Sequence, residues 1–150
     1  MLVATDAQIE DLIRKLMRIG LDNMLGYTDD VTTLDTELQT SDIIDLDTFK
    51  TYLNRNNVQV VDLRGATEYS AEHVEGAENV FIGTLDRNLD KISRDRPVVI
   101  YCQGGVRATI GYSILARNGF TNVKNFSGSM NEWVAQGNTV AAAETELVTT

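Results

Sequence analysis

Pro97-Val-Val-Ile-Tyr-Cys-Gln-Gly-Gly-Val-Arg107 is the stretch that determines the fold class of this 150-residue chain. Its first part, Pro97–Tyr101, is a β-branched apolar run without polar alternation, which is typical of a strand buried on both faces of a parallel sheet. Cys102–Arg107 follows as a tight loop, because two adjacent glycines permit a sharp turn. The apolar spacing of residues 108–118 then predicts a helix. The stretch is therefore predicted to be a strand, a loop and a helix.

Strands and helices alternate on both sides of this stretch. We expect helices near residues 47–53, 66–71, 85–92 and 130–135, strands at 58–63 and 122–126, and a short apolar segment at 80–82. Asp47 is the predicted N-cap of the first of these helices. Such alternation predicts an α/β fold, an open and mainly parallel sheet with helices on both faces.

The N-terminal part has a different pattern. Residues 5–19 predict an amphipathic helix with Thr5 as its N-cap and Gly20 after its end, and Leu21–Tyr27 predicts the entry to a short strand. Asp29–Asp47 contains seven acidic residues and no lysine or arginine. We interpret that region as a solvated linker.

Part of the N-terminal pattern recurs later in the chain. A shift of 99 places lays Leu16–Tyr27 on Leu115–Phe126, with Leu, Arg, Gly and Asn in register. One interpretation is that any junction of helix, glycine and strand resembles another. The alternative hypothesis is that residues 5–27 are the last helix and strand of a preceding copy of the same domain, so that the chain is part of a longer protein.

Charge and cysteine content limit the function classes. The formal net charge of −9 lacks the basic footprint expected of a protein that binds nucleic acid or an anionic membrane. A single cysteine allows no intramolecular disulfide, which favours a reducing cytoplasm. Cys102 and His73 are the only soft ligands, so we expect no metal and no cofactor.

The loop after the buried strand has the parts of an anion-binding nucleophile. Gly104 and Gly105 let backbone N–H groups turn inward, and the helix N-terminus adds its positive end. Cys102 would lie at the carboxyl end of a parallel strand, where α/β sheets bind ligands. Backbone dipoles and Arg107 are expected to favour its thiolate. The competing interpretation is a buried cysteine that ends a core strand.

Over residues 43–137 the chain resembles rhodanese-like sulfurtransferases. The loop Cys102-x4-Arg107-Ala is similar to the active-site loop of that family. Further similarity lies in Asp62-Leu-Arg64, Glu68-Tyr69, His73–Val80, Asn118-Gly-Phe120, Gly128 and Trp133. The family usually has two adjacent glycines near Gly128, where this chain has Ser127 and Ser129 around a single glycine.

The resemblance implies a rhodanese-like fold and sulfane-sulfur transfer through a persulfide on Cys102. Its partners would be a small anionic donor, such as thiosulfate, polysulfide or a thiol persulfide, and a thiol or cyanide-like acceptor. Cys102 and Arg107 are the implied catalytic residues, and the substrate-binding residues are Gln103, Gly104, Gly105, Val106 and Ala108. We interpret Asp62 and Arg64 as a buried structural ion pair, and His73 as structural support.

The same resemblance suggests a domain plan. Residues 1–40 would be the remnant of a preceding copy plus the acidic linker, 41–140 the rhodanese domain and 141–150 a C-terminal tail. Fusions of such copies with metallo-β-lactamase domains have a similar helix and strand at this point, so such a domain is a candidate partner in a longer protein.

Three other functions are open. Cys102 could relay sulfur to a protein partner, with cyanide as a poor acceptor. A phosphatase or arsenate reductase is a second alternative, although related enzymes of that kind have a loop one residue longer, and four intervening residues favour sulfur over phosphate. The third is a non-catalytic module, which the presence of both Cys102 and Arg107 disfavours.

Overall fold

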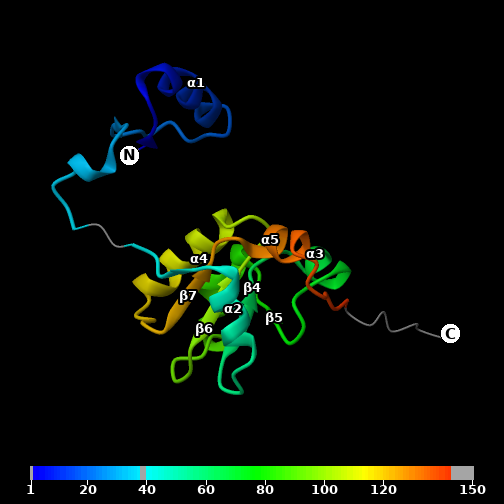
Figure 1. The fold of residues 1–150 in the computed structure, drawn as a ribbon. Coiled ribbons are helices and arrows are strands. Elements are labelled where there is room, and N and C mark those ends of the chain that lie inside the picture. The colour runs from blue at the N-terminus through cyan, green and yellow to red at the C-terminus, as the bar shows by residue number, and fades with distance from the viewer. Residues whose placement is uncertain (1, 38–39, 143–150) are drawn as a thin grey trace. The chain divides into compact units, whose positions relative to one another are not determined.

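A computed structural model describes residues 2–37 and 40–142 of the chain (Figure 1). The chain divides into two compact units, Met1–Thr40 and Ser41–Thr150. Residues 143–150 of the predicted tail lie outside the described residues. The larger unit contains the Cys102 loop.

The larger unit is built on a five-stranded parallel sheet. Its strands lie in the order β3-β7-β6-β4-β5, and every neighbouring pair is parallel. The strands are β3 (Ile43–Ile44), β4 (Gln59–Asp62), β5 (Glu78–Asn79), β6 (Val98–Tyr101) and β7 (Val123–Phe126). The predicted buried strand is thus β6, at the centre of the sheet, and the loop that follows it emerges in the middle of the carboxyl edge.

Helices cover both faces of this sheet, as predicted (Figure 1). One face packs on α4 (Val106–Arg117) and on two 3₁₀ segments, η2 (Ile82–Arg87) and η3 (Leu89–Lys91). The other face packs on α2 (Leu46–Leu53), α3 (Ala66–Ala71) and α5 (Ser129–Ala135).

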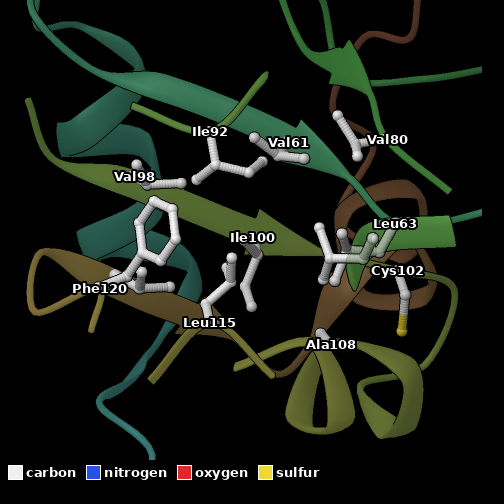
Figure 2. Packing of buried hydrophobic residues seen from close by; sticks show 12 residues of the cluster. Val61, Leu63, Val80, Ile92, Val98, Ile100, Cys102, Ala108, Leu115 and Phe120 are labelled. Atoms are coloured by element: carbon white, nitrogen blue, oxygen red, sulfur yellow. The ribbon is translucent and has the colours of Figure 1, made fainter. Parts of the chain in front are cut away.

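Alternate residues of β6 supply the two halves of the core. Val98, Ile100 and Cys102 belong to the cluster beneath α4, whereas Val99 and Tyr101 belong to the cluster on the opposite face. All are 1% exposed or less, and each buried aliphatic side chain contributes about 1.5–3 kcal/mol. Figure 2 shows Cys102 at one end of the first cluster, beside Leu63 and Ala108. The position of the Cys102 side chain is therefore fixed by core packing.

Three local predictions were wrong. Ile43–Ile44 forms the edge strand β3 inside the region interpreted as a linker, because Ile44 is buried against the sheet despite the acidic neighbours. Asp45, not Asp47, caps α2, since its carboxylate accepts from the Thr48 N–H at 2.8 Å. The segment 85–92 contains two short 3₁₀ pieces and no α-helix, and Asn88, with φ −125°, interrupts the helical path between them.

The smaller unit is a parallel strand, helix and strand. β1 (Leu2–Val3) pairs with β2 (Tyr27–Thr28), α1 (Asp6–Met17) connects them, and the 3₁₀ turn η1 (Val31–Thr33) follows. The strand predicted at residues 21–27 thus forms only at Tyr27 and extends one residue further, to Thr28. No residue of α1 is buried. The unit has the same order of elements as β6, α4 and β7, and its origin in a preceding copy stays a prediction.

A backbone bridge lies at the predicted end of the larger domain. Ala141, one residue beyond the predicted boundary at 140, pairs with His73 through two backbone hydrogen bonds of 2.8 Å. The chain before it is anchored by Trp133, whose indole N–H donates to the Thr139 carbonyl at 2.8 Å.

Candidate active site

Cys102 follows β6 directly and lies next to the start of α4. Its side chain is part of the buried core, and the residue is only 1% exposed. The loop Cys102–Gly105 is joined to the start of α5 by backbone hydrogen bonds: the N–H groups of Met130 and Asn131 donate to the carbonyls of Cys102 and Gln103, at 3.1 and 3.0 Å. Strand, loop and two helices therefore hold one sulfur atom.

Gly105 is the residue that requires glycine in this loop. Its φ of +92° lies in the region that side chains disfavour, and a Cβ here would be 2.5 Å from the carbonyl oxygen of Ser127. This conformation directs the Gly105 N–H to the Cys102 sulfur at 3.2 Å. At Gly105, the backbone N–H thus turns inward to the Cys102 sulfur, as predicted for this loop.

The environment of Cys102 lowers the pKa of its thiol. Burial opposes ionisation, but hydrogen bonds outweigh it and hold the pKa below the ordinary value of 9.0. The donors are the backbone N–H groups of Ala108, Gly104 and Gly105 and the hydroxyl of Ser129. A thiolate is therefore available closer to neutral pH than in a free cysteine.

Arg107 makes an ion pair that the sequence did not predict. Its Nη1 and Nη2 each lie 2.7 Å from a carboxylate oxygen of Glu68, a bidentate geometry. These hydrogen bonds are the main reason that the pKa of Arg107 is raised, and the charge of Cys102 adds less. The Arg107 hydrogen bonds also lower the pKa of Glu68 to about 2. Glu68, which further accepts from the Gly65 N–H at 3.1 Å, therefore positions the predicted anion-binding group.

Asp62 and Arg64 form a buried ion pair of 2.8 Å that supports the loop. Arg64 also donates through Nη1 to the amide oxygen of Gln103 at 2.9 Å. The Gln103 amide nitrogen donates in turn to Asn131 at 2.8 Å. Both ends of the Gln103 side chain are thus engaged in holding the loop, so a contact with substrate would have to break one of these hydrogen bonds.

The other predicted residues have different surroundings. Val106 is 73% exposed at the start of α4, whereas Ala108 is fully buried and directs its N–H toward the sulfur. Gly104 supplies a third backbone N–H, beside those of Gly105 and Ala108. His73 stacks on Tyr69, with ring centroids 3.9 Å apart, and its Nδ1 lies 2.8 Å from the Tyr69 carbonyl oxygen. Those contacts suit the structural role expected of His73.

Two contributors were missed in the sequence, Glu68 and Ser129. Glu68 is separated from Arg107 by 39 residues, and no local pattern indicates that they pair. Ser129 gave a weak signal, because it stands beside Gly128 where the resembling family usually continues with glycine. Its hydroxyl lies 3.9 Å from the Cys102 sulfur.

Within residues 2–37 and 40–142, no group of three or more histidine, cysteine, aspartate or glutamate side chains could hold a metal ion. The helices among these residues are also too short or too polar to cross a membrane.

Comparison with known proteins now identifies the family. The family model described as "Rhodanese-like domain" matches residues 45–136. The chain belongs to the rhodanese-like domain family. This rhodanese-like domain is 33% identical over 75 residues to the uncharacterized protein YqhL of Bacillus subtilis, covering 50% of the chain and 60% of that protein. It is 29% identical over 77 residues to the thiosulfate sulfurtransferase GlpE of Shewanella oneidensis, covering 51% and 76%.

Solved structures support the same assignment. A rhodanese-like domain protein from Staphylococcus aureus is 27% identical and superposes with a TM-score of 0.61, covering 68% of this chain and 98% of that one. These likenesses support the rhodanese-like fold and family. The chain spans about three fifths of the length of YqhL.

Proposed function

We propose that the protein transfers sulfane sulfur from a small anionic donor to a thiophilic acceptor through a persulfide on Cys102. The observation that carries the proposal is the Cys102 sulfur itself: hydrogen bonds from three backbone N–H groups and the Ser129 hydroxyl lower its pKa at the carboxyl edge of the sheet. A sulfur anion held in this way is both a nucleophile and a stable carrier. One reduced thiol of this kind suits a reducing compartment, so we propose the cytoplasm as its location.

The first step is attack of the Cys102 thiolate on the outer sulfur of the donor. With thiosulfate, a new S–S bond forms on Cys102, the bond within thiosulfate breaks, and sulfite leaves with the electron pair. Because the backbone donors already stabilise the thiolate, no general base is needed. Arg107 attracts the anionic donor, and the Glu68 carboxylate has to share or release one of its two hydrogen bonds when the donor arrives.

The second step returns the enzyme to its starting state. A thiolate, formed when the acceptor thiol loses its proton to solvent, or a cyanide anion attacks the outer sulfur of the persulfide, and the Cys102 thiolate leaves with the electron pair. The same N–H groups that favour the starting thiolate favour it as a leaving group. Gly105, which directs one of them at 3.2 Å, therefore acts in both steps.

Turnover with thiosulfate and cyanide tests this proposal. We expect thiocyanate formation by the full chain and none by Cys102→Ser. Hydrolysis of an aryl phosphate, measured with the same pair of proteins, separates the phosphatase alternative. Aryl phosphate hydrolysis that needs Cys102, without thiocyanate formation, would overturn the proposal in favour of phosphate chemistry.

A protein acceptor is the second candidate, and the surface next to the loop favours it. Val106 and Ile110, one turn apart on α4, are 73% and 52% exposed. On the α5 side, a groove is lined by Gln103, Asn131 and Val134, together with Glu72, Met130 and Ala135. Such apolar surface beside a nucleophile suits contact with a protein. Persulfide that forms readily but is discharged slowly by cyanide and quickly by a partner thiol would favour the relay.

The smaller unit supports one further proposal about the whole protein. We propose that residues 5–27 end a preceding rhodanese-like copy, which links this chain to a metallo-β-lactamase-like domain. The parallel order of β1, α1 and β2, at an offset of 99 residues from β6, α4 and β7, supports the first part. The mass of the protein from its native source is the test. A product that begins at Met1 would overturn the proposal.

A further inference from the structure

Ser129, the first residue of α5, has a backbone conformation that serine disfavours. Its φ is +56°, and it is the only residue other than glycine with a positive φ in the described part of the chain. A side chain in this left-handed region is sterically disfavoured, and glycine avoids that strain. The neighbouring glycine does not need its freedom, because Gly128 is right-handed with φ −63°. Backbone conformation therefore predicts glycine at position 129, and the serine needs another reason.

The hydroxyl of Ser129 supplies that reason, because it joins three parts of the active site. It accepts a hydrogen bond from the Cys102 N–H at 3.2 Å. As a donor it has two acceptors within reach, the Phe126 carbonyl oxygen at 2.9 Å and the Cys102 sulfur at 3.9 Å. The residue is fully buried, so water does not replace these partners. The Ser129 hydroxyl proton can thus be donated either to the Phe126 carbonyl at the end of β7 or to the Cys102 sulfur.

The charge on sulfur decides where this proton goes. A neutral thiol is a weak acceptor, so the proton stays with the nearer Phe126 carbonyl. A thiolate is an anion and accepts a stronger, charge-assisted hydrogen bond. A small rotation of the Ser129 hydroxyl would therefore supply a further donor when Cys102 ionises, beside those of the loop backbone.

The charged groups around Cys102 are largely neutralised by one another. Arg107 of α4 pairs with Glu68 of α3, and Arg64 pairs with Asp62 of β4. The Tyr101 hydroxyl is buried, and its pKa is raised by that burial and by the charge of Asp62. Neutral donors therefore have a large share in stabilising the sulfur anion, and Ser129 is the one side chain among the hydrogen-bond donors that lower the Cys102 pKa.

We propose that Ser129 is a positioning residue for the nucleophile, kept in a strained conformation because its hydroxyl donates to the Cys102 sulfur when the thiol ionises. The proposal rests on the proposed function only for its consequence, which is a faster first step of sulfur transfer. The contact itself concerns the ionisation of Cys102 and can be measured without any sulfur donor.

The test compares Ser129→Gly and Ser129→Ala by the pH dependence of Cys102 alkylation with iodoacetamide. Both variants remove the hydroxyl, so both should move the midpoint up by roughly 0.5–1 pH unit, the equivalent of one net hydrogen bond. Alkylation near neutral pH should slow about 3- to 10-fold. Ser127→Ala is the matched control, because Ser127 is exposed and lies two residues away.

The stability of the two variants toward urea distinguishes the effect of backbone strain from the effect of losing the hydroxyl. Ser129→Gly relieves the left-handed strain and Ser129→Ala does not, so the glycine variant should unfold at a higher urea concentration than the alanine variant. If the alanine variant does not fold, the glycine variant carries the test alone. An alkylation midpoint of Ser129→Gly equal to that of Ser127→Ala would overturn the proposal. Because alkylation by iodoacetamide needs no sulfur donor, the alkylation result can be interpreted even if the protein does not transfer sulfur.

Discussion

Two segments of this chain, β1–α1–β2 and β6–α4–β7, share one topology and differ in almost everything that matters for chemistry. Both are a parallel strand, a helix and a parallel strand. The shift of 99 residues sets Val3 opposite Cys102 and Gln8 opposite Arg107. The first segment thus has neither a cysteine nor an arginine at the corresponding positions. The shared topology alone therefore does not make a site.

The connecting loops show the physical difference. Two residues separate β1 from α1, and the Thr5 N–H at the helix start is satisfied by the Gln8 side chain at 3.3 Å. Four residues separate β6 from α4, and there the Gly105 N–H is directed to the Cys102 sulfur. At the start of α1, the helix's own Gln8 side chain accepts from the N-terminal N–H group. At the start of α4, the N-terminal N–H group is available to an anion.

The largest expected difference between the two segments is in stability, and it follows from how deeply their helices are buried. Leu115 of α4 is fully buried, whereas its counterpart at the same offset, Leu16 of α1, is only partly buried. Leu115→Ala should lower the free energy of unfolding by about 2–5 kcal/mol, and Leu16→Ala by less than about 1 kcal/mol. Urea unfolding followed by circular dichroism measures both. Equal losses would mean that α1 is packed as tightly as α4.

Backbone geometry gives the second contrast, between Gly105 and Gly20. Both have positive φ, but a Cβ at Gly105 would be 2.5 Å from the Ser127 carbonyl oxygen, and one at Gly20 meets nothing within 4 Å. Gly105→Ala should displace the loop and reduce thiocyanate formation about 100-fold or more. Gly20→Ala should keep full activity and cost about 1 kcal/mol of stability. Activity retained in Gly105→Ala would contradict the assigned role of the loop.

The smallest expected effect on stability comes from the ion pairs that the two segments make. The folded pKa of Glu68 is about 2 against an ordinary 4.5, so its contribution to stability is present above about pH 4.5 and is lost as the pH falls toward 2. Glu68→Gln should flatten the stability profile across that window and change stability at pH 7 by less than about 1 kcal/mol. Urea unfolding at several pH values tests this. Asp11→Asn, which breaks the exposed pair with Lys15 in α1, is the control.

Local features of the larger unit could be predicted, because they depend on neighbours in the sequence. The apolar run of β6, the glycines of the loop and the segment Ala66–Ala71 all matched the structure. β3 was missed because two isoleucines among acidic residues have no strand pattern of their own, and only the edge of β7 makes them a strand.

The candidate site was only half predictable for a related reason. Cys102 and Arg107 lie within one loop and helix start, so their spacing in the sequence indicates the chemistry. Glu68 and Ser129 reach them from α3 and α5, across 39 and 27 residues. Those contacts depend on the order of strands in the sheet, which brings several carboxyl ends to one edge. Sequence spacing does not contain that order.

The intact mass of the protein after incubation with thiosulfate tests the central claim most directly. The full chain should gain the mass of one sulfur atom, Cys102→Ser should gain none, and cyanide should remove the gain with release of thiocyanate. A chain that takes up no sulfur from thiosulfate or from polysulfide would contradict the account. So would an equal gain by Cys102→Ser, because the sulfur would then be carried elsewhere.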